Sequence, residues 1–486
     1  MIEKSQQVDE LLHKLKKIAS KSLRKGRIKT CLAALSFAAE SLYMFNQIYT
    51  DDDIEFLTAQ AGDMIKSKFG FSGYSKCQDT ILVYDGFGLD TRGVVLMYLN
   101  ALGMNGYKVC YVTDKKVRKS IPTIKKMCAK YNIDISYIDT TNYEKWCVQI
   151  ARVFEEVKPR VAFFYTTPFD TAACAAFHIY EGVCRRYLID LTDHAYWLGK
   201  CASDYFLGSR EMSAYIQHYE RNIPNEKCIK LGVNVYAESE KNHMGLPFDV
   251  EREKYIFSGG ALYKTLGDPD NTYYKIIRHI MEKHENIMFL YAGTGDDREL
   301  KKIIADYPDR AFHINERKDF YYLIRNCVLY LNTYPMFGGM MMKYSALAHR
   351  LPVTLKHGSD SDGLLLHQKD CQIEYNSYND LITDVDRLLD DDDYRKERER
   401  LLEGSVITET RFTNNIRGLI EKNKTDYAHE FMKMDTTKFR QEYYKRFDYK
   451  QNMLNIVKRN NVLLFWYFPV DFIVGVFKKI IIKKER

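Results

Sequence analysis

The sequence predicts an α/β protein with two successive units, each built on a doubly wound parallel sheet. Three observations predict this fold class. From residue 80 onward, short apolar segments of strand length alternate with segments of helical periodicity. A stretch with little regular pattern, residues 236–253, divides this series in two. The length of 486 residues suits two or three domains with a large core.

The segments of strand length are rich in β-branched and aromatic residues. The first series is 80–85, 107–114, 133–139, 160–167, 185–191, 203–209 and 227–233, and the second is 255–260, 287–293, 311–315, 328–335 and 351–356. Residues before 75 are predicted to be helical from the spacing of Leu11, Leu12, Leu15 and Ile18, and helix returns after residue 390. The predicted organisation is a helical extension, 1–75, a first α/β domain, 76–240, a second α/β domain, 254–410, and returning helices with a basic and aromatic tail, 411–486.

Positive charge gathers at the two ends of the chain. The net charge is +7, but the first 30 residues hold nine Lys or Arg against three Asp or Glu, and the last 47 hold eleven against four. The interior therefore carries about −6. A nucleic-acid groove needs positive charge in the body of the fold, so no nucleic-acid partner is predicted. Basic ends suit a protein that rests on an anionic membrane, although solvated terminal helices would have the same pattern.

The composition favours a globular protein of the cytoplasm. Hydrophobic residues make up 46% and charged residues 28%, which excludes a disordered chain. The eleven cysteines include no CxxC pair and no cluster at zinc spacing, as is typical of reduced thiols. The N-terminal segment lacks the apolar stretch of a secretory signal.

Residues 462–477 are predicted to form an interfacial membrane anchor. They are apolar except for Asp471 and contain the aromatic cluster 465–468. At about 1.5 Å per residue they are too short to cross a hydrocarbon core of about 30 Å, and aromatic residues prefer the interface. The basic residues that follow would attract anionic lipid: Lys478, Lys479, Lys483 and Lys484. The predicted location is the inner face of the cell membrane, and a helix folded onto the protein's own core is the alternative.

A loop with three glycines, DGFGLDTRG at 85–93, joins the first predicted strand to a helix. Glycines at such a turn let the backbone approach a ligand, and the start of the helix favours an anion. The glycine spacing is not GxGxxG, so a nicotinamide dinucleotide is not expected. The loop would present Asp90 and Arg92 at the carboxyl end of the sheet, unless Asp90 only caps the helix.

Two glycine pairs mark the second unit. Gly259 and Gly260 follow a strand, with Lys264 about one turn later, and Gly338 and Gly339 lie between a proline-containing turn and a helix. Both pairs would offer backbone N–H groups at strand ends, where the Lys264 ammonium could join them around a diphosphate. A nucleoside diphosphate leaving group requires such stabilisation because its departure builds negative charge.

The phrases GGALYK at 259–264 and LNTYPMFGGMMMKYSALAHRLPV at 331–353 resemble the donor motifs of GT-B glycosyltransferases, in particular enzymes similar to O-linked N-acetylglucosamine transferase and its bacterial relatives. The resemblance covers 78–235 and 254–370 and implies two Rossmann-like domains facing a central cleft. It implies a nucleotide sugar, with a UDP-sugar favoured, as co-substrate. The implied donor-binding residues are Gly259, Gly260, Tyr263, Lys264, Gly338, Gly339, Met340, Met341 and Ser345, and the implied acceptor-binding residues are Asp85, Gly88 and Arg92. Trp197 to Gly199 and Asp204 with Tyr205 match further phrases of the family.

The sequence departs from the family pattern at the phosphate-binding helix. Met340 to Met342 replace His-Thr-Thr, so backbone groups must bind the phosphates. Ser345 stands where a ribose-binding carboxylate is expected, which leaves the nucleotide open. The ExxxxxxxE pair of many retaining enzymes is absent after Gly339, which favours an inverting reaction. There is also no tetratricopeptide array to read a protein acceptor.

An inverting transfer needs a base for the acceptor's hydroxyl proton. The candidates are Asp90 and His194, which lies beside Asp193; His194 could also be a structural residue of its loop. The position on the first loop favours Asp90. Lys264 would act on the leaving phosphate.

The DxD pairs at 268–270, 360–362 and 384–386 are common by chance, and a donor site with Lys264 needs no divalent ion. Neither an essential metal nor a cofactor is predicted. The predicted function is a hexosyltransferase-type transfer from a nucleotide diphosphate sugar to a lipid-linked glycan, in the assembly of bacterial capsule, O-antigen or another envelope polysaccharide. The alternatives are a nucleotide-sugar epimerase of the same fold and a non-catalytic scaffold.

Overall fold

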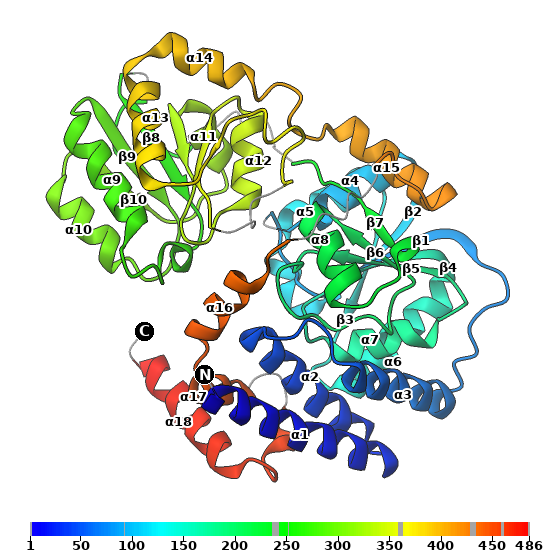
Figure 1. The fold of residues 1–486 in the computed structure, drawn as a ribbon. Helices are drawn as coiled ribbons and strands as arrows, with labels where there is room; N and C mark the ends of the chain where they lie inside the picture. The colour runs from blue at the N-terminus through cyan, green and yellow to red at the C-terminus, as the bar shows by residue number, and fades with distance from the viewer. Residues whose placement is uncertain are drawn as a thin grey trace. The chain divides into compact units, whose positions relative to one another are not determined.

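A computed structural model shows the chain folded into two compact units (Figure 1). It describes residues 2–91, 93–235, 243–250, 252–357, 363–427, 434–457 and 461–484. Unit 1 contains Met1–Leu231, Thr413–Lys433 and Thr437–Arg486, and unit 2 contains Gly232–Phe412 and Met434–Thr436.

Among the described residues of unit 1, seven strands form one parallel sheet in the order β3-β2-β1-β4-β5-β6-β7. The strands are β1 Gln78–Asp85, β2 Lys108–Asp114, β3 Asp134–Ile138, β4 Pro159–Tyr165, β5 Arg185–Asp190, β6 Tyr205–Gly208 and β7 Cys228–Lys230. All seven overlap segments predicted from the sequence, although β1 and β4 begin one or two residues earlier. Strand β1 is buried from Thr80 to Asp85, because a parallel sheet is covered on both faces; this is why the segment is apolar without alternation.

Helices of unit 1 cover the sheet and extend beyond it. Those between strands are α4 Val95–Met104, α5 Pro122–Lys130, α6 Tyr143–Val157, α7 Thr171–Ile179 and α8 Glu211–Tyr215. The N-terminal helices are α1 Ile2–Arg24, α2 Ile28–Phe45 and α3 Asp52–Phe69, and the C-terminal ones are α15 Glu409–Lys422, α16 Thr437–Arg446, α17 Tyr449–Met453 and α18 Pro469–Lys484. Helix α2 packs against α1, α3, α6 and α7, and its residues 31–39 are all buried.

Helix α2 also explains an apolar stretch that could be mistaken for a membrane span. Among the described helices it alone has the length and hydropathy to cross a bilayer, but 78% of it is buried within the protein. That degree of burial is the property of a core helix. The cysteines are packed in the same way: of the eleven, Cys77 is exposed, Cys201 is half-buried and the others are buried.

In unit 2, the described residues form a second parallel sheet in the order β10-β9-β8-β11-β12-β13. Its strands are β8 Lys254–Gly259, β9 Ile287–Ala292, β10 Ala311–Ile314, β11 Leu329–Leu331, β12 Pro352–Leu355 and β13 Glu374–Tyr375. Its helices are α9 Thr272–Lys283, α10 Arg298–Asp306, α11 Phe320–Asn326, α12 Gly339–Leu347, α13 Tyr378–Asp390 and α14 Asp392–Arg400. Five strands match the predicted segments, and β13 is an addition to them.

The two sheets have the same connectivity. In each, the first strand along the chain lies between the second and the fourth. The first three strands are therefore added toward one edge of the sheet, and the later strands are added toward the other edge. In α/β sheets, ligands bind outside the carboxyl ends of the strands at this reversal. It lies between β1 and β4 in unit 1 and between β8 and β11 in unit 2. The α/β fold class predicted from the sequence is confirmed.

Candidate functional site

Glycines at the carboxyl edge of the second sheet bring two loops into close contact. Gly260, with a φ of +131°, follows β8, and its N–H donates to the Ala292 carbonyl at 3.0 Å. A Cβ atom on Gly293, which follows β9, would lie only 1.9 Å from the Gly260 carbonyl oxygen. A side chain on Gly293 would therefore push the loops apart, and at Gly260 the positive φ favours glycine. Because of this close approach, the backbone of Gly260 and Gly293 carries no side chain of its own at the ends of β8 and β9.

Asn332, at the end of β11, shapes the loop that leads into α12. Its side-chain Oδ1 accepts hydrogen bonds from the N–H groups of Thr333 at 3.0 Å and Gly338 at 2.8 Å. Its Nδ2 donates to Thr354 Oγ1 on β12 at 3.1 Å. These bonds fix the N-terminus of α12, which starts at Gly339. Asn332 was not predicted as a site residue, although a polar residue directly after a buried apolar strand is a usable signal.

Lys264 lies beside the N-terminus of α12. Its Nζ is 3.5 Å from the carbonyl oxygen of Phe337, and its own carbonyl accepts from Met336 N–H at 3.1 Å. Burial lowers the pKa of Lys264, and among the described residues no acidic side chain forms an ion pair with it. The Lys264 ammonium and the positive end of α12 thus lie together, and none of the described carboxylates pairs with this ammonium. Such an arrangement is suited to an anion.

The other predicted donor-binding residues differ in how far they are exposed. Tyr263 is exposed, and Met340 and Met341 are half-buried against the core, with Met341 Cε reaching 3.5 Å from a Cβ built on Gly259. Ser345 is buried, and its Oγ donates to the carbonyl of Arg350 at 2.6 Å at the other end of α12. Its hydroxyl is therefore engaged in the helix terminus.

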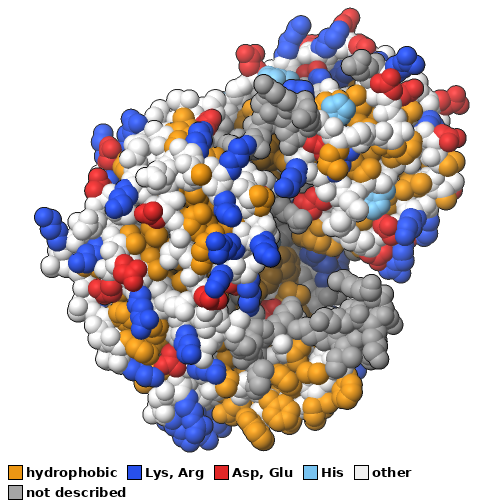
Figure 2. Space-filling model, turned by 180° about the vertical axis from the view of Figure 1, so that it is seen from behind, with side chains coloured by type: hydrophobic (Ala, Val, Ile, Leu, Met, Phe, Trp, Pro, Cys, Tyr) orange, Lys and Arg blue, Asp and Glu red, His pale blue; other side chains and the backbone are white. Residues whose placement is uncertain are grey.

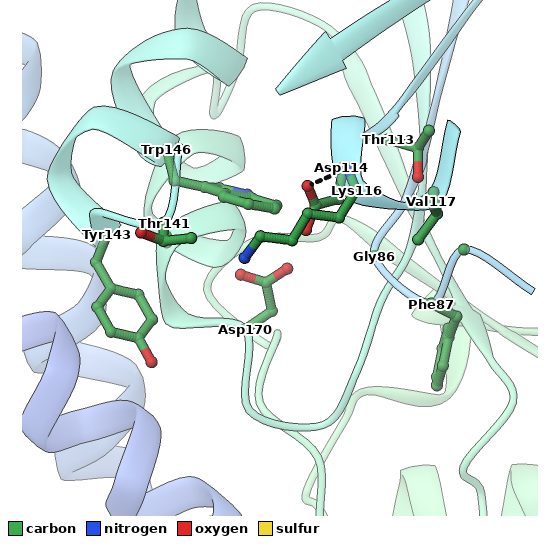
Figure 3. Close-up of a pocket in the computed structure, with 12 residues that line it drawn as sticks. Gly86, Phe87, Thr113, Asp114, Lys116, Val117, Thr141, Tyr143, Trp146 and Asp170 are labelled. Carbon is green, nitrogen blue, oxygen red and sulfur yellow. Dashed lines mark hydrogen bonds between the residues drawn. The ribbon is translucent and has the colours of Figure 1, made fainter. Parts of the chain in front are cut away.

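Unit 1 contains a cavity of about 110 Å³ at the carboxyl edge of its sheet (Figure 3). Residues 86–88 after β1, 113–114 at the end of β2, 116–117 after β2 and Thr141 after β3 line it, together with Trp146 on α6 and Asp170 just before α7. In Figure 3 the ammonium of Lys116 and the carboxylate of Asp170 point toward one another, with the indole of Trp146 beside them. An aromatic ring with a few convergent polar groups is typical of a small-molecule site.

The polar wall of this cavity is rigidly held. Asp170 Oδ2 accepts from the hydroxyls of Tyr84 at 2.7 Å and Thr166 at 3.0 Å, and its Oδ1 accepts from Ala173 N–H at the start of α7. Trp146 Nε1 in turn donates to Tyr84 Oη at 3.1 Å. Neither Trp146 nor Asp170 was predicted, because they come from helices that only the tertiary fold brings together.

Two of the predicted acceptor residues shape the loop of this cavity. The Asp85 carboxylate is buried and accepts from Tyr111 Oη at 2.6 Å and from the N–H groups of Phe87 and Gly88 at 2.9 Å. Burial raises the pKa of Asp85, although these hydrogen bonds oppose the shift. Gly88 has a φ of +62° and lines the cavity. Arg92 lies outside the described residues.

Of the two candidate bases, Asp90 makes a structural contact. Its Oδ1 accepts a hydrogen bond at 3.0 Å from the N–H of Ile124, in the first turn of α5. Asp90 therefore caps α5, and not α4, the helix that follows its own loop.

His194 follows β5 and is oriented by a buried ion pair. Its Nδ1 lies 3.4 Å from Asp193 Oδ1. Asp193 accepts from Arg210 Nε at 2.6 Å and Nη2 at 2.8 Å and from Ser213 Oγ at 2.7 Å. Burial acts to raise the pKa of Asp193, but Arg210 and His194 hold it well below its usual range. His194 is not among the residues that line the cavity of unit 1.

The remaining motifs of the first unit have structural contacts. The guanidinium of Arg221 lies 3.9 Å from the ring centre of Trp197, and the Gly199 N–H donates to Glu55 Oε1. Asp204 accepts from Arg186 Nη2 at 2.7 Å and Nε at 3.2 Å. These contacts hold α3 and the loops around β5 and β6 together.

The acidic pairs considered for a metal have other contacts where the structure describes them. Asp268 Oδ2 accepts from Thr272 N–H at the start of α9, and Asp386 bonds His279, Lys283 and His284. The pair at 360–362 lies outside the described residues. Within the described ranges, no three His, Cys, Asp or Glu side chains gather as a metal site would require.

The fold is shared with known enzymes. A putative UDP-N-acetylglucosamine 2-epimerase from Listeria monocytogenes matches with a TM-score of 0.52 and 12% identity, over 74% of this chain and 100% of that chain. A glycosyltransferase from Rickettsia africae ESF-5 matches with a TM-score of 0.52 and 11% identity, over 72% and 100%. A further UDP-N-acetylglucosamine 2-epimerase matches with a TM-score of 0.50 and 11% identity, over 74% and 100%. No protein family and no curated protein matches the sequence.

These similarities define the class of fold. The chain has the GT-B fold, with two parallel α/β units and helical extensions at its two ends, as the sequence predicted. At this level of identity the similarity extends to the fold alone.

Proposed function

We propose that this protein is a glycosyltransferase that moves a sugar from a nucleotide diphosphate sugar to a glycan. The observation that carries the proposal is the position of Lys264, whose ammonium lies at the N-terminus of α12 beside the glycine loops of the second sheet. A diphosphate would supply the negative charge that this site lacks within the described residues. A UDP-sugar is the favoured donor, in keeping with the names of the epimerases of the same fold.

The chemistry assigned to this site is stabilisation of the leaving group. As the bond between the anomeric carbon and the phosphate oxygen breaks, charge grows on the diphosphate. Lys264 and the N–H groups around Gly260 and Gly339 would take up this charge without a metal ion. Met340 and Met341 contribute no hydroxyl groups, so recognition of the phosphates would fall to the backbone and to Lys264.

The acceptor would bind to unit 1. The cavity beside Gly86 offers the indole of Trp146 and the charges of Lys116 and Asp170, a combination suited to a sugar. Of the two candidate bases, His194 has the better-oriented side chain; because it does not line this cavity, the reacting hydroxyl would have to extend from the cavity to the loop after β5. Asp193 orients Nδ1 of His194, so that Nε2 would carry the lone pair that accepts the hydroxyl proton in an inverting reaction.

The proposed setting is the assembly of a bacterial envelope polysaccharide, such as capsule or O-antigen. A lipid-linked acceptor would bring the enzyme to the cytoplasmic face of the membrane. The support is chemical: the chain has basic ends, an acidic interior and an apolar segment before its C-terminal lysines.

Binding and turnover with purified protein test the proposal. UDP-, GDP-, dTDP- and CMP-linked sugars are titrated by calorimetry, and nucleotide release is followed with and without lipid-linked glycan. Lys264→Ala should abolish binding of the preferred donor. Lys275→Ala, an exposed lysine on α9 of the same unit, is the matched control and should bind normally. Donor binding that is the same in both variants would remove Lys264 from the site.

A nucleotide-sugar epimerase is the second candidate, because two of the similar structures carry that name. An epimerase would interconvert the sugar of a soluble donor without an acceptor and without net transfer. Nucleotide release that depends on acceptor identifies the transferase, and a new nucleotide sugar formed without acceptor identifies the epimerase. Tight donor binding without either reaction would identify a non-catalytic scaffold.

A further inference from the structure

The C-terminal helix α18 exposes large apolar side chains on one side. Trp466, just before the helix, is 83% exposed, and Phe477 within it is 62% exposed. Val470, Ile473, Val474 and Val476 are exposed as well. Separations of three, four and seven residues place Val470, Ile473, Val474 and Phe477 on one face of the helix. We call these four residues and Trp466 the apolar face.

The opposite side of α18 is packed against unit 1. The ring of Phe468 meets that of Phe37 on α2, edge to face, with centres 6.4 Å apart. A Cβ atom on Gly475 would lie 2.9 Å from Val457 Cγ1, so the helix backbone is close to the segment beneath it. The apolar face is therefore exposed even though α18 is packed against unit 1. The alternative named from the sequence, a helix folded onto the protein's own core, describes the packed side of α18, and the membrane anchor stays a prediction.

A row of basic side chains on α1 begins next to this surface. Lys14 Nζ donates to the Tyr467 carbonyl at 2.8 Å and lies 4.0 Å from the ring centre of Phe468. Lys17, Lys21 and Arg24 follow at helical spacing, and all are exposed. We call these four residues the basic row. Figure 2 shows a large hydrophobic area and a group of basic side chains on the part of unit 1 where Figure 1 places α1 and α18.

The charge of the basic row is directed to solvent. Lys16 points elsewhere and is neutralised by Asp51 at 2.6 Å and Asp53 at 3.0 Å. Among the described residues, no ion pair involves Lys17, Lys21 or Arg24. The acidic residues nearby are Glu10, one turn before Lys14, and Asp471 in the first turn of α18. The positive charges thus outnumber the negative ones beside the apolar face.

We propose that the apolar face and the basic row together form one surface that docks on an anionic lipid bilayer. Aromatic and aliphatic side chains enter the interface between headgroups and acyl chains, and lysines beside them attract anionic headgroups. The two parts come from opposite ends of the chain and meet at the contact between Lys14 and Tyr467. The proposal names a binding surface and does not depend on which reaction the enzyme catalyses.

Sedimentation with vesicles tests this surface in the full-length protein. The vesicles contain either phosphatidylcholine alone or equal parts of phosphatidylcholine and phosphatidylglycerol. We expect sedimentation with the second kind only, because the basic row requires anionic lipid. The Trp466→Ala/Phe477→Ala variant and the Lys17→Glu/Lys21→Glu variant should each partition at least about tenfold more weakly than the unchanged protein.

Matched controls separate the surface from general effects. Phe56→Ala/Phe69→Ala removes two other exposed aromatic side chains, and Lys422→Glu/Lys424→Glu makes the same change of charge on exposed positions of α15 and just after it. Both should bind vesicles as the unchanged protein does. All variants alter exposed side chains, whereas removal of the chain from Phe468 onward would also uncover Phe37. Circular dichroism and donor binding verify that each variant is folded.

Two results would overturn the proposal. One is a full-length protein that stays in the supernatant with anionic vesicles. The other is a protein that sediments equally well in all variants. If the apolar face instead joins two copies of the chain, light scattering will show a dimer that Trp466→Ala/Phe477→Ala converts to a monomer, without any vesicle binding. Loss of donor turnover with normal vesicle binding would contradict the proposed function and leave the surface standing.

Discussion

The Nδ1 atom of His194 lies 3.4 Å from Oδ1 of Asp193, and the same carboxylate is held by two hydrogen bonds from Arg210. A buried carboxylate that is fixed on one side orients an imidazole on the other. This relationship fixes the orientation of the His194 ring. Asp90 is not oriented for proton transfer in this way, because its carboxylate accepts a hydrogen bond from the backbone of α5.

Substitution of the two candidate bases should therefore have unequal effects. His194→Ala is expected to lower kcat by a factor of about 10²–10⁴, the usual contribution of a general base, with donor affinity unchanged. Asp90→Asn should leave kcat nearly unchanged, because the amide oxygen can still accept from Ile124 N–H. The measurement is the rate of nucleotide release at saturating donor and acceptor. The opposite pattern, with Asp90→Asn inactive and His194→Ala active, would assign the base to Asp90.

Gly293→Ala should damage the donor site and destabilise unit 2. The added methyl group would lie 1.9 Å from the Gly260 carbonyl, so the loops after β8 and β9 must separate. Overpacking of this kind costs about 1–3 kcal/mol, and we expect donor binding to weaken together with the free energy of unfolding. Urea unfolding by circular dichroism and donor titration measure the two effects. Gly245→Ala is the control, since a Cβ there has no atom within 4 Å; equal behaviour of the two variants would argue against the close contact.

The sequence predicted most of the sheets because their signals are local. Strands such as β1 and β4 are buried on both faces, so their residues form apolar runs that stand out from the helices. Strand β13 escaped prediction because it has only two residues, Glu374 and Tyr375, and both are half-buried. A strand of that length is defined by its pairing with β12, which the sequence does not show.

The site was predictable only in part, for a related reason. The glycines and Lys264 of unit 2 follow strands directly, and the carboxyl ends of parallel strands meet at one edge. In unit 1 the cavity depends on Trp146 from α6 and Asp170 before α7, which meet through Tyr84. No spacing in the sequence indicates that contact. Likewise, the exposed lysines of α1 are far from Trp466 along the sequence, and only the fold places Lys14 beside Tyr467.

Lys116→Ala should weaken acceptor binding without a change in stability. The side chain is exposed, and in Figure 3 its ammonium extends over the cavity toward Asp170. Loss of one hydrogen bond from a charged group corresponds to an increase in the acceptor KM of about tenfold or more. The KM for the donor should stay the same. Lys119→Ala, at the end of the same short helix, is the control; a rise in acceptor KM in that variant as well would point to a general charge effect.

The buried carboxyl group of Asp190 should make the stability of unit 1 depend on pH. Burial raises the pKa of Asp190 to about 6, although the charge of Arg221 acts to lower it, and Gln217 Nε2 donates to its Oδ2 at 2.9 Å. An aspartate in the unfolded chain loses its proton near pH 4. Between pH 4 and pH 6 the folded state therefore binds more protons than the unfolded state, and the contribution of Asp190 to the free energy of unfolding decreases as the pH rises.

Asp190→Asn tests this dependence because asparagine keeps an acceptor for Gln217 but does not titrate. From pH 4 to pH 7, the free energy of unfolding of the unchanged protein should fall by about 2 kcal/mol relative to that of the variant, given a shift of roughly two pKa units. Tryptophan fluorescence during urea unfolding reports on unit 1 specifically, because Trp146, Trp197 and Trp466 all belong to that unit. Parallel curves for the two proteins would mean that Asp190 ionises in the folded protein as it does in the unfolded chain, and that Arg221 compensates fully for its burial.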